Sequence, residues 1–290
     1  MKNNRRVVNF VVPFRGRFEL LERCIQSLFS QANGDWLAHI VEDNSNWDVT
    51  DRKKLHVLID SDPRITLYEN SERQGPLHNV YDIIVNHLKG EDTIIAQLDG
   101  DDWLLPNATN VILELHEAAD VTYGQFLRYA PWTAWHMQLG HCRDYPKQIQ
   151  LDNAYEDYPW LSSHLKTFKR KYFINIPYES FIDVRSGNFW DSAYDQAFML
   201  PILIMADNDK IHFNRIPIYV YDMEDRRERH VHENKQIETE RYIRQAVKYY
   251  IKEGNRFENL EAVCCSCNMK KHDKTKEEFL NENKDTGSES

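Results

Sequence analysis

Apolar and polar residues along the first hundred positions follow two different periods in turn. Short, nearly continuous apolar runs are typical of buried strands, and they lie at 7–13, 36–41, 64–68 and 93–98. Between them, apolar residues recur at helical spacing over 17–31, 49–59 and 75–88. Strands that alternate with helices over short connections predict an α/β fold with a mostly parallel central sheet and right-handed crossovers.

The second half of the chain has a less regular pattern and many aromatic residues. We expect a helix over 194–205, a strand over 216–221 and a charged amphipathic helix over 236–253. A strongly charged stretch, 222–233, connects the last two elements. The aromatic density fits either a packed core or a surface on which sugar rings stack.

Polar side chains follow three of the predicted strands, directly after each strand ends. Arg15 follows the first strand, Asp43 follows the second, and Asp-Gly-Asp-Asp at 99–102 follows the fourth. Because ligands of open α/β sheets bind beyond the carboxyl ends of the strands, we expect one crevice to gather these groups. Clustered carboxylates suit Mg²⁺ or Mn²⁺, and such an ion can hold a diphosphate. Taken alone, the tetrapeptide is also typical of an acidic turn.

The composition restricts the classes of protein to which the chain can belong. With 290 residues, 41% of them hydrophobic and 28% charged, it has the profile of a globular protein with one large domain or a domain plus an appendage. The formal net charge of −10 argues against nonspecific binding of polyanions. The apolar run at 7–14 is too short for a signal-peptide core or a membrane span, so we expect a cytoplasmic protein.

These landmarks together resemble the family-2 glycosyltransferases with the GT-A fold, over residues 5–225. The segment Val-Val-Pro-Phe-Arg-Gly-Arg at 11–17 is similar to the first strand and loop of that family and to the VPFRxR opening of galactosyl- and chondroitin-type transferases. Val-Glu-Asp-Asn-Ser at 41–45 is similar to the VDDxS turn, with Glu42 in place of the usual Asp, and 99–102 resembles the DxD motif. The resemblance implies a Rossmann-like nucleotide-diphospho-sugar transferase.

The resemblance also implies roles for individual residues on the donor side of the site. Pro13, Arg15, Asp43 and Asp99 would bind the nucleotide sugar, with Asp43 at the base and Asp99 toward the ribose. Asp101 would bind Mn²⁺ or Mg²⁺ under the diphosphate.

A third motif lies at 187–196, where the sequence resembles the W/F-x-x-x-ED segment of the family. Asp195 aligns with the acid that acts as catalytic base, and Tyr194 stands where Glu or Gly is more usual. Such a base takes a proton from the acceptor hydroxyl. Asp191 is the competing candidate, and an acid that opens a helix can instead simply stabilise the helix dipole.

His230 and His232 follow the expected strand at 216–221. Related transferases with the VPFRxR opening place a metal-binding His after their last core strand. Either imidazole could therefore complete the coordination of the ion at Asp101, although a His in a charged loop is usually solvated.

The tail at 259–271 resembles the C-terminal half of an HNH endonuclease motif. It holds a single C-x-x-C pair, Cys264 and Cys267, whereas a structural zinc site usually takes four ligands. We interpret it as a remnant or a docking tail. The expected organisation is a GT-A domain over 1–225, with a nucleotide-sugar-binding half (1–103) and an acceptor half (104–225). A charged loop and helix (226–255) and the Cys/Lys tail (256–290), with a disordered end, follow it.

The sequence therefore predicts an inverting, metal-dependent glycosyltransferase. It would move a sugar from a nucleotide-diphosphate sugar, UDP-linked by resemblance, to an acceptor hydroxyl on a glycan or a small molecule. Two alternatives stay open. The acceptor could be a hydroxylated base in DNA, as in phage-type DNA glycosylation. The chain could also be a nucleic-acid-binding or nicking protein whose α/β half is only a scaffold.

Overall fold

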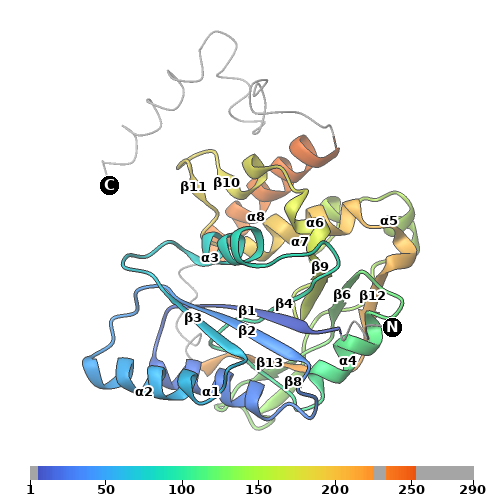
Figure 1. Ribbon diagram of the computed structural model, residues 1–290. Coiled ribbons are helices and arrows are strands. Elements are labelled where there is room, and N and C mark those ends of the chain that lie inside the picture. The colour runs from blue at the N-terminus through green and yellow to red at the C-terminus, as the bar shows by residue number, and fades with distance from the viewer. Residues whose placement is uncertain (1–5, 225–232, 253–290) are drawn as a thin grey trace.

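The computed structural model describes residues 6–224 and 233–252 (Figure 1). His230, His232 and the tail at 256–290 lie outside the described residues, so the predictions made for them stay predictions. A seven-stranded sheet with the order β12-β6-β9-β4-β1-β2-β3 forms the centre. Its strands are β1 (Val8–Phe14), β2 (Trp36–Glu42), β3 (Ile65–Glu69), β4 (Ile94–Gln97), β6 (Val121–Gly124), β9 (Lys166–Lys169) and β12 (Ile211–Asn214).

The strand directions confirm the predicted mostly parallel sheet. Strand β1 pairs in parallel with β2 and β4, β2 pairs in parallel with β3, and β12 pairs in parallel with β6. Strand β9 alone in this sheet runs antiparallel to its neighbours, β4 and β6. All seven residues of β1 are buried, as expected for a central parallel strand that is covered on both faces.

Helices cover both faces of the sheet (Figure 1). On one face lie α1 (Phe18–Phe29), α2 (Val49–Asp60) and α4 (Ala108–Leu115). On the other lie α3 (Pro76–Asp82), α6 (Arg170–Ile174), α7 (Tyr194–Met205) and α8 (Glu233–Val247). The helix expected over 75–88 is present, but its last turn, Ile83–His87, is a π-helix, and α8 likewise continues into a π-helix at Lys248–Lys252.

Two smaller sheets complete the described part of the chain. The first has the order β5-β13-β7-β8 and consists of β5 (Trp103–Leu104), β13 (Tyr219–Asp222), β7 (Leu127–Tyr129) and β8 (Met137–Leu139). The second is a hairpin of β10 (Ile182–Asp183) and β11 (Asn188–Phe189). The short helix α5 (Lys147–Leu151) and the 3₁₀ turns Tyr155–Asp157, Tyr178–Phe181 and Asn208–Lys210 lie in the connections. Among the described residues, no helix is both long and apolar enough to cross a membrane.

Candidate active site

The carboxyl ends of β1, β2 and β4 open into one cavity of about 780 Å³, which the start of α7 also lines. The cavity brings together seven of the residues singled out from the sequence, which are Pro13, Arg15, Asp43, Asp99, Asp101, Asp191 and Asp195. From α8, Gln236 and Glu240 also line it. The site thus lies where the topology of an open α/β sheet places ligands.

Asp43 follows β2 and is 2% exposed. Its carboxylate accepts hydrogen bonds from the backbone N–H groups of Gln74 and Gly75, at 2.8 and 2.9 Å, and from Asn70 Nδ2 at 2.8 Å. Burial alone would raise the pKa of Asp43, but these hydrogen bonds outweigh it and hold the pKa below its usual value. Asp43 is therefore an ionised group that also fixes the loop leading into α3.

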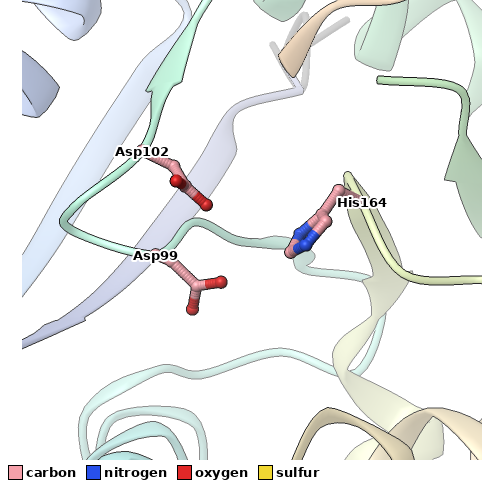
Figure 2. Close-up of side chains that lie close together, drawn as sticks. All are labelled: Asp99, Asp102 and His164. Atoms are coloured by element: carbon pink, nitrogen blue, oxygen red, sulfur yellow. The ribbon is translucent and has the colours of Figure 1, made fainter. Parts of the chain in front are cut away.

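Three potential metal ligands meet beside the cavity (Figure 2). One ligand atom each of Asp99, Asp102 and His164 lies within 4.8 Å of the other two. The His164 ring stacks on Tyr219, with centroids 4.7 Å apart and an interplanar angle of 9°. Carboxylates with one imidazole form a donor set that suits Mn²⁺. No motif singled out His164 in the sequence, because it precedes a strand that the pattern did not reveal.

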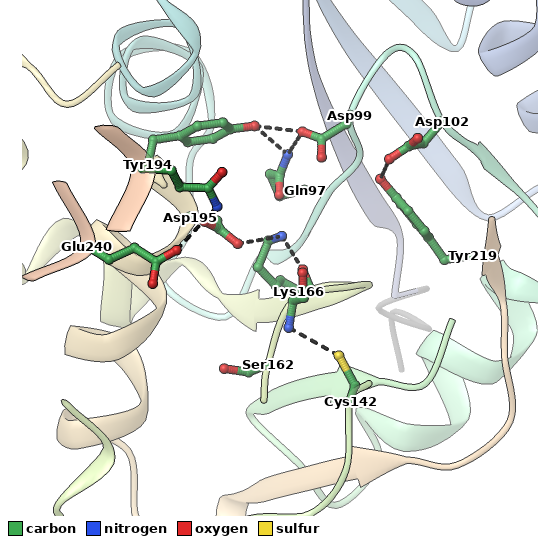
Figure 3. A network of polar contacts seen from close by, with 12 residues as sticks. Gln97, Asp99, Asp102, Cys142, Ser162, Lys166, Tyr194, Asp195, Tyr219 and Glu240 are labelled. Atoms are coloured by element: carbon green, nitrogen blue, oxygen red, sulfur yellow. Dashed lines mark hydrogen bonds and ion pairs between the residues drawn. The ribbon is translucent and has the colours of Figure 1, made fainter. Parts of the chain in front are cut away.

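Asp102 differs from the other two acids of the motif because both of its carboxylate oxygens are engaged in the protein frame. It is 0% exposed, and it accepts hydrogen bonds from Tyr219 Oη at 2.5 Å and from the backbone N–H of Asp222 at 2.7 Å (Figure 3 shows the Tyr219 bond). These bonds tie the end of the motif to β13. Asp99 and Asp101, in contrast, line the cavity.

Gly100 is required between these acids, because the chain there passes close to Phe14. A Cβ atom at Gly100 would lie 2.7 Å from Phe14 Cδ2, a distance that real side chains do not show. Glycine therefore allows the motif to pack against the end of β1 while Asp99 and Asp101 line the cavity.

The start of α7 is hydrogen-bonded to the same motif (Figure 3). Tyr194 Oη donates to Asp99 Oδ1 at 2.6 Å, and Gln97 Nε2 donates to the same oxygen at 2.7 Å. Ala193 precedes α7 in the left-handed region, with φ at 50°, a conformation that is uncommon for a residue with a Cβ. Tyr194 was noted in the sequence only as a departure from the family pattern, but in the structure it connects the donor motif with the helix.

Asp195 lies in the first turn of α7, with its side chain 20% exposed. Lys166 Nζ lies 3.6 Å from Asp195 Oδ2, and this ammonium, which is 1% exposed, also donates to the backbone oxygen of Ser163. Burial raises the pKa of Asp195, and the charges of Asp99 and Glu240 raise it further. The Lys166 charge lowers it but does not cancel the other effects, so the pKa stays above its usual value.

Asp191, the other candidate base, has a different environment at the edge of the cavity. Its Oδ1 lies 2.6 Å from Arg73 Nη2, and the two side chains are 53% and 52% exposed. Asp191 is thus half-exposed and ion-paired with a guanidinium, whereas Asp195 is mostly buried beside an ammonium.

Lys166 and Glu240 were missed because their local sequence hides them. Lys166 opens the strand Lys-Thr-Phe-Lys, whose charged ends suggest a surface segment, yet its side chain is fully buried. Glu240 belongs to a helix rich in charged residues, where a further carboxylate resembles any solvent-facing group. Only the tertiary structure, in which both charges act on Asp195, distinguishes Lys166 and Glu240 from ordinary surface residues.

The fold and the acidic motif at the ends of the strands define a GT-A glycosyltransferase, and comparisons with solved structures agree. S. aureus TarS 1–349 in complex with UDP-GlcNAc superposes with a TM-score of 0.55 at 12% identity, over 83% of this chain and 66% of that one. The mannosyltransferase PcManGT from Pyrobaculum calidifontis, in complex with GDP-Man and Mn²⁺, superposes with a TM-score of 0.51 at 16% identity, over 99% of this chain and 77% of that one. A longer TarS structure superposes with a TM-score of 0.52 at 14% identity, over 84% of this chain but only 40% of that one.

Residues 9–176 match the family described as "Glycosyl transferase family 2", which is more than half of the chain. The chain therefore belongs to glycosyl transferase family 2. No curated protein sequence matched it.

Proposed function

We propose that the chain is an inverting, divalent-metal-dependent glycosyltransferase that moves a sugar from a nucleotide-diphosphate sugar to an acceptor hydroxyl. The observation that carries this proposal is the meeting of Asp43, Asp99, Asp101 and Asp195 in one cavity, although they come from the ends of β2 and β4 and from α7. A transferase of this kind must bind a nucleoside, hold a diphosphate and deprotonate an acceptor; we assign the first function to Asp43, the second to Asp99 and Asp101 with the ion, and the third to Asp195.

The donor binds along the ends of the parallel strands in this proposal. Asp43 is ionised and fixed by the loop before α3, so it can accept a hydrogen bond from an N–H group of a nucleotide base. Arg15 and Pro13 line the same end of the cavity. A uridine diphosphate donor is our first choice, because of the resemblance of the motifs and because the TarS structures contain UDP or UDP-GlcNAc.

The acids after β4 fit a divalent ion. Asp99 and Asp101 line the cavity, and ligand atoms of Asp99, Asp102 and His164 lie within 4.8 Å of one another, although Asp102 is also held by Tyr219 and by the backbone of Asp222. From the resemblance to the DxD motif we assign Asp101 as the principal ligand, with Asp99 and His164 beside it. A bound Mn²⁺ or Mg²⁺ would neutralise charge on the leaving diphosphate.

Asp195 takes the proton of the acceptor hydroxyl in this mechanism. A carboxyl group with a raised pKa is a stronger base than an ordinary aspartate, and Lys166 keeps its charged form accessible despite burial. Tyr194 and Gln97 hold Asp99 in place while this occurs. Direct attack of the activated hydroxyl on the anomeric carbon, with one base and no enzyme nucleophile, inverts the configuration at that carbon.

A donor screen tests the proposal. Purified protein is incubated with UDP- and GDP-linked sugars with Mn²⁺, Mg²⁺ or EDTA, and release of the nucleotide is measured. We expect release with at least one donor, loss of release in EDTA, and loss of both release and metal-dependent nucleotide binding in Asp101→Ala. Undiminished Mn²⁺-dependent nucleotide affinity of the folded Asp101→Ala variant in calorimetry would overturn the metal assignment.

A further inference from the structure

A second cavity of about 330 Å³ adjoins the candidate active site. It lies between the loop before α3, the β10–β11 hairpin and α8, which are neighbours above the main sheet in Figure 1. Arg73, Asp191 and Ser192 line both cavities, so the two spaces share a wall. Two residues of this wall, Asp191 and Ser192, precede Asp195 by four and three positions in the chain.

The shared wall is an ion pair that a ligand can displace. Arg73 and Asp191 are each about half exposed, and pairs of this kind contribute only about 0.2–1 kcal/mol. A polar ligand that reaches over the pair can replace these contacts with its own hydrogen bonds at little cost. The second cavity thus adjoins the active site across this ion pair, on the side of α8 and the β10–β11 hairpin.

The charges in the second cavity indicate what it can bind. Both guanidinium groups in this cavity are paired with carboxylates. Arg185 donates two hydrogen bonds to Asp183, at 2.9 and 2.7 Å, and Arg73 forms an ion pair with Asp191. The remaining polar lining is neutral and consists of hydroxyl and amide groups, from Gln74, Ser186, Asn188, Ser192 and Thr239. Phe189 contributes a partly exposed aromatic ring, whereas Trp190 is only 1% exposed. Neutral hydrogen-bonding groups beside an aromatic ring suit a polyhydroxylated ligand.

A polyanion would need a different surface. Nucleic-acid binding draws on cations that are available to phosphate groups. Asp183 and Asp191 balance the charges of the two arginines of this cavity, so its lining has no net charge, and the adjoining active site adds more carboxylates, Asp43, Asp99, Asp101, Asp195 and Glu240, than cations, Arg15 and Arg128. The lining of the two cavities therefore disfavours a DNA strand as the acceptor.

We propose that the second cavity is the acceptor subsite and that it takes a neutral saccharide, whose reacting hydroxyl passes the Arg73–Asp191 pair to reach Asp195. This inference rests on the proposed transferase function and deepens it by naming the class of acceptor. The attacking oxygen loses its proton to Asp195 and forms the new glycosidic bond, while the bond from the anomeric carbon to the diphosphate breaks.

The test blocks the second cavity and measures the donor and acceptor sides separately. Asn188 and Ser186 line it on exposed positions of the hairpin, so Asn188→Trp and Ser186→Trp should fill the space without disturbing the core. Asn86→Trp is the matched control, since Asn86 is equally exposed but lies outside both cavities. Folding is checked by circular dichroism, and donor hydrolysis without acceptor serves as the second check.

The probes are neutral disaccharides (lactose, maltose and diacetylchitobiose), glucuronic acid and a duplex DNA with hydroxymethylated cytosine. Binding is followed by saturation-transfer NMR with nucleotide and Mn²⁺ present, and transfer by kinetics. We expect a neutral disaccharide to bind, and its affinity or KM to weaken at least tenfold in both tryptophan variants but not in Asn86→Trp, with donor hydrolysis unchanged.

Three results would overturn the inference. They are no binding by any neutral saccharide while the donor is hydrolysed, unchanged saccharide binding in both folded tryptophan variants, or preferred use of glucuronic acid or the DNA. Failure of the wild-type protein to hydrolyse any donor would instead overturn the proposed transferase function, so the two failures can be told apart.

Discussion

Asp43 and Asp195 line the same cavity, yet their surroundings have opposite effects on their carboxyl groups. Two backbone N–H groups and the Asn70 amide stabilise the charge of Asp43, whose pKa is lowered. Asp195 is buried beside Asp99 and Glu240, and its pKa is raised in spite of Lys166. The turn after β2 thus provides a fixed anion, whereas the start of α7 provides a group with affinity for a proton. In the mechanism that we propose, this difference separates the nucleotide-binding carboxylate from the catalytic base within a single site.

Asp195→Asn should have the largest effect on this contrast. The amide has nearly the same volume but cannot accept the proton of the acceptor, so transfer should fall by about 10²–10⁴-fold while donor binding persists. Initial rates of transfer and nucleotide affinity are the two measurements. Asp191→Asn is the control, because that carboxylate is paired with Arg73 at the rim. A dead Asp191→Asn variant together with an active Asp195→Asn variant would mean that the base has been assigned four residues too late.

Asp43→Asn should destabilise the protein by about 2 kcal/mol, because an amide cannot accept from Gln74, Gly75 and Asn70 together. Donor affinity should fall with it. Since the pKa of Asp43 is lower in the folded state, its stabilising contribution is present above the unfolded pKa and is lost as pH falls through the folded value. Denaturant unfolding at pH 6 and pH 3 should therefore show a smaller loss of stability with acid in the variant.

Asp48→Asn is the matched control for this change. Asp48 also accepts two backbone hydrogen bonds, from Thr50 and Asp51, but at the exposed N-cap of α2, where asparagine is an equally good cap. Equal destabilisation by both substitutions would contradict the special role of the buried carboxylate.

Lys166→Met should move the acidic limb of the pH–rate profile upward by about one pH unit. Without the ammonium, only the backbone hydrogen bond from Gln196 still opposes burial and the charges of Asp99 and Glu240, so the pKa of Asp195 rises further and less base is available at a given pH. Lys169→Met is the control on the same strand, since Lys169 pairs with Asp120 and Asp92 instead. A limb at the wild-type pH in Lys166→Met would show that the ammonium does not act on the base.

Tyr194→Phe should have the smallest effect. It removes one hydrogen bond to Asp99 and leaves the one from Gln97, so we expect the donor KM to rise about fivefold with little change in kcat. Tyr155→Phe removes a similar hydroxyl, bonded to Asn208 outside the cavity, and should leave the donor KM as it is. Equal effects of the two would reduce Tyr194 to a general packing residue.

Much of the donor side could be predicted from the sequence because its signals are local. The strands before Arg15, Asp43 and Asp99 are continuous apolar runs, and the acids follow them directly. The helix at 194–205 was predicted with the bounds that the structure has, because most of its residues are apolar, and the stretch from Gln196 to Leu203 is buried. These patterns place a residue at the end of an element without any knowledge of its distant neighbours.

The rest of the site depends on contacts between distant segments. Lys166 lies on β9, which the pattern did not reveal because a strand of four residues with lysine at both ends lacks a hydrophobic signature. His164 precedes that strand and meets Asp99 and Asp102 only through folding. Directly after the motif, Trp103–Leu104 forms β5 against β13, a pairing of two residues that leaves no periodic pattern in the sequence. The position of such a short strand depends on the distant strand with which it pairs, and not on its own sequence.

The antiparallel strand β9 has a consequence for how the chain is made. Strand β4 ends at Gln97, but β9, which pairs with β4 on one edge and with β6 on the other, starts only at Lys166. At a synthesis rate of about 5–20 residues per second, the edge of β4 stays unpaired for several seconds, until the roughly 70 residues up to β9 have been made. An exposed apolar edge is a template for wrong pairing, so a nascent chain halted between these points is a natural client for chaperones. Helix α7, which carries the proposed base Asp195, is completed later still, so the proposed activity can appear only late in synthesis.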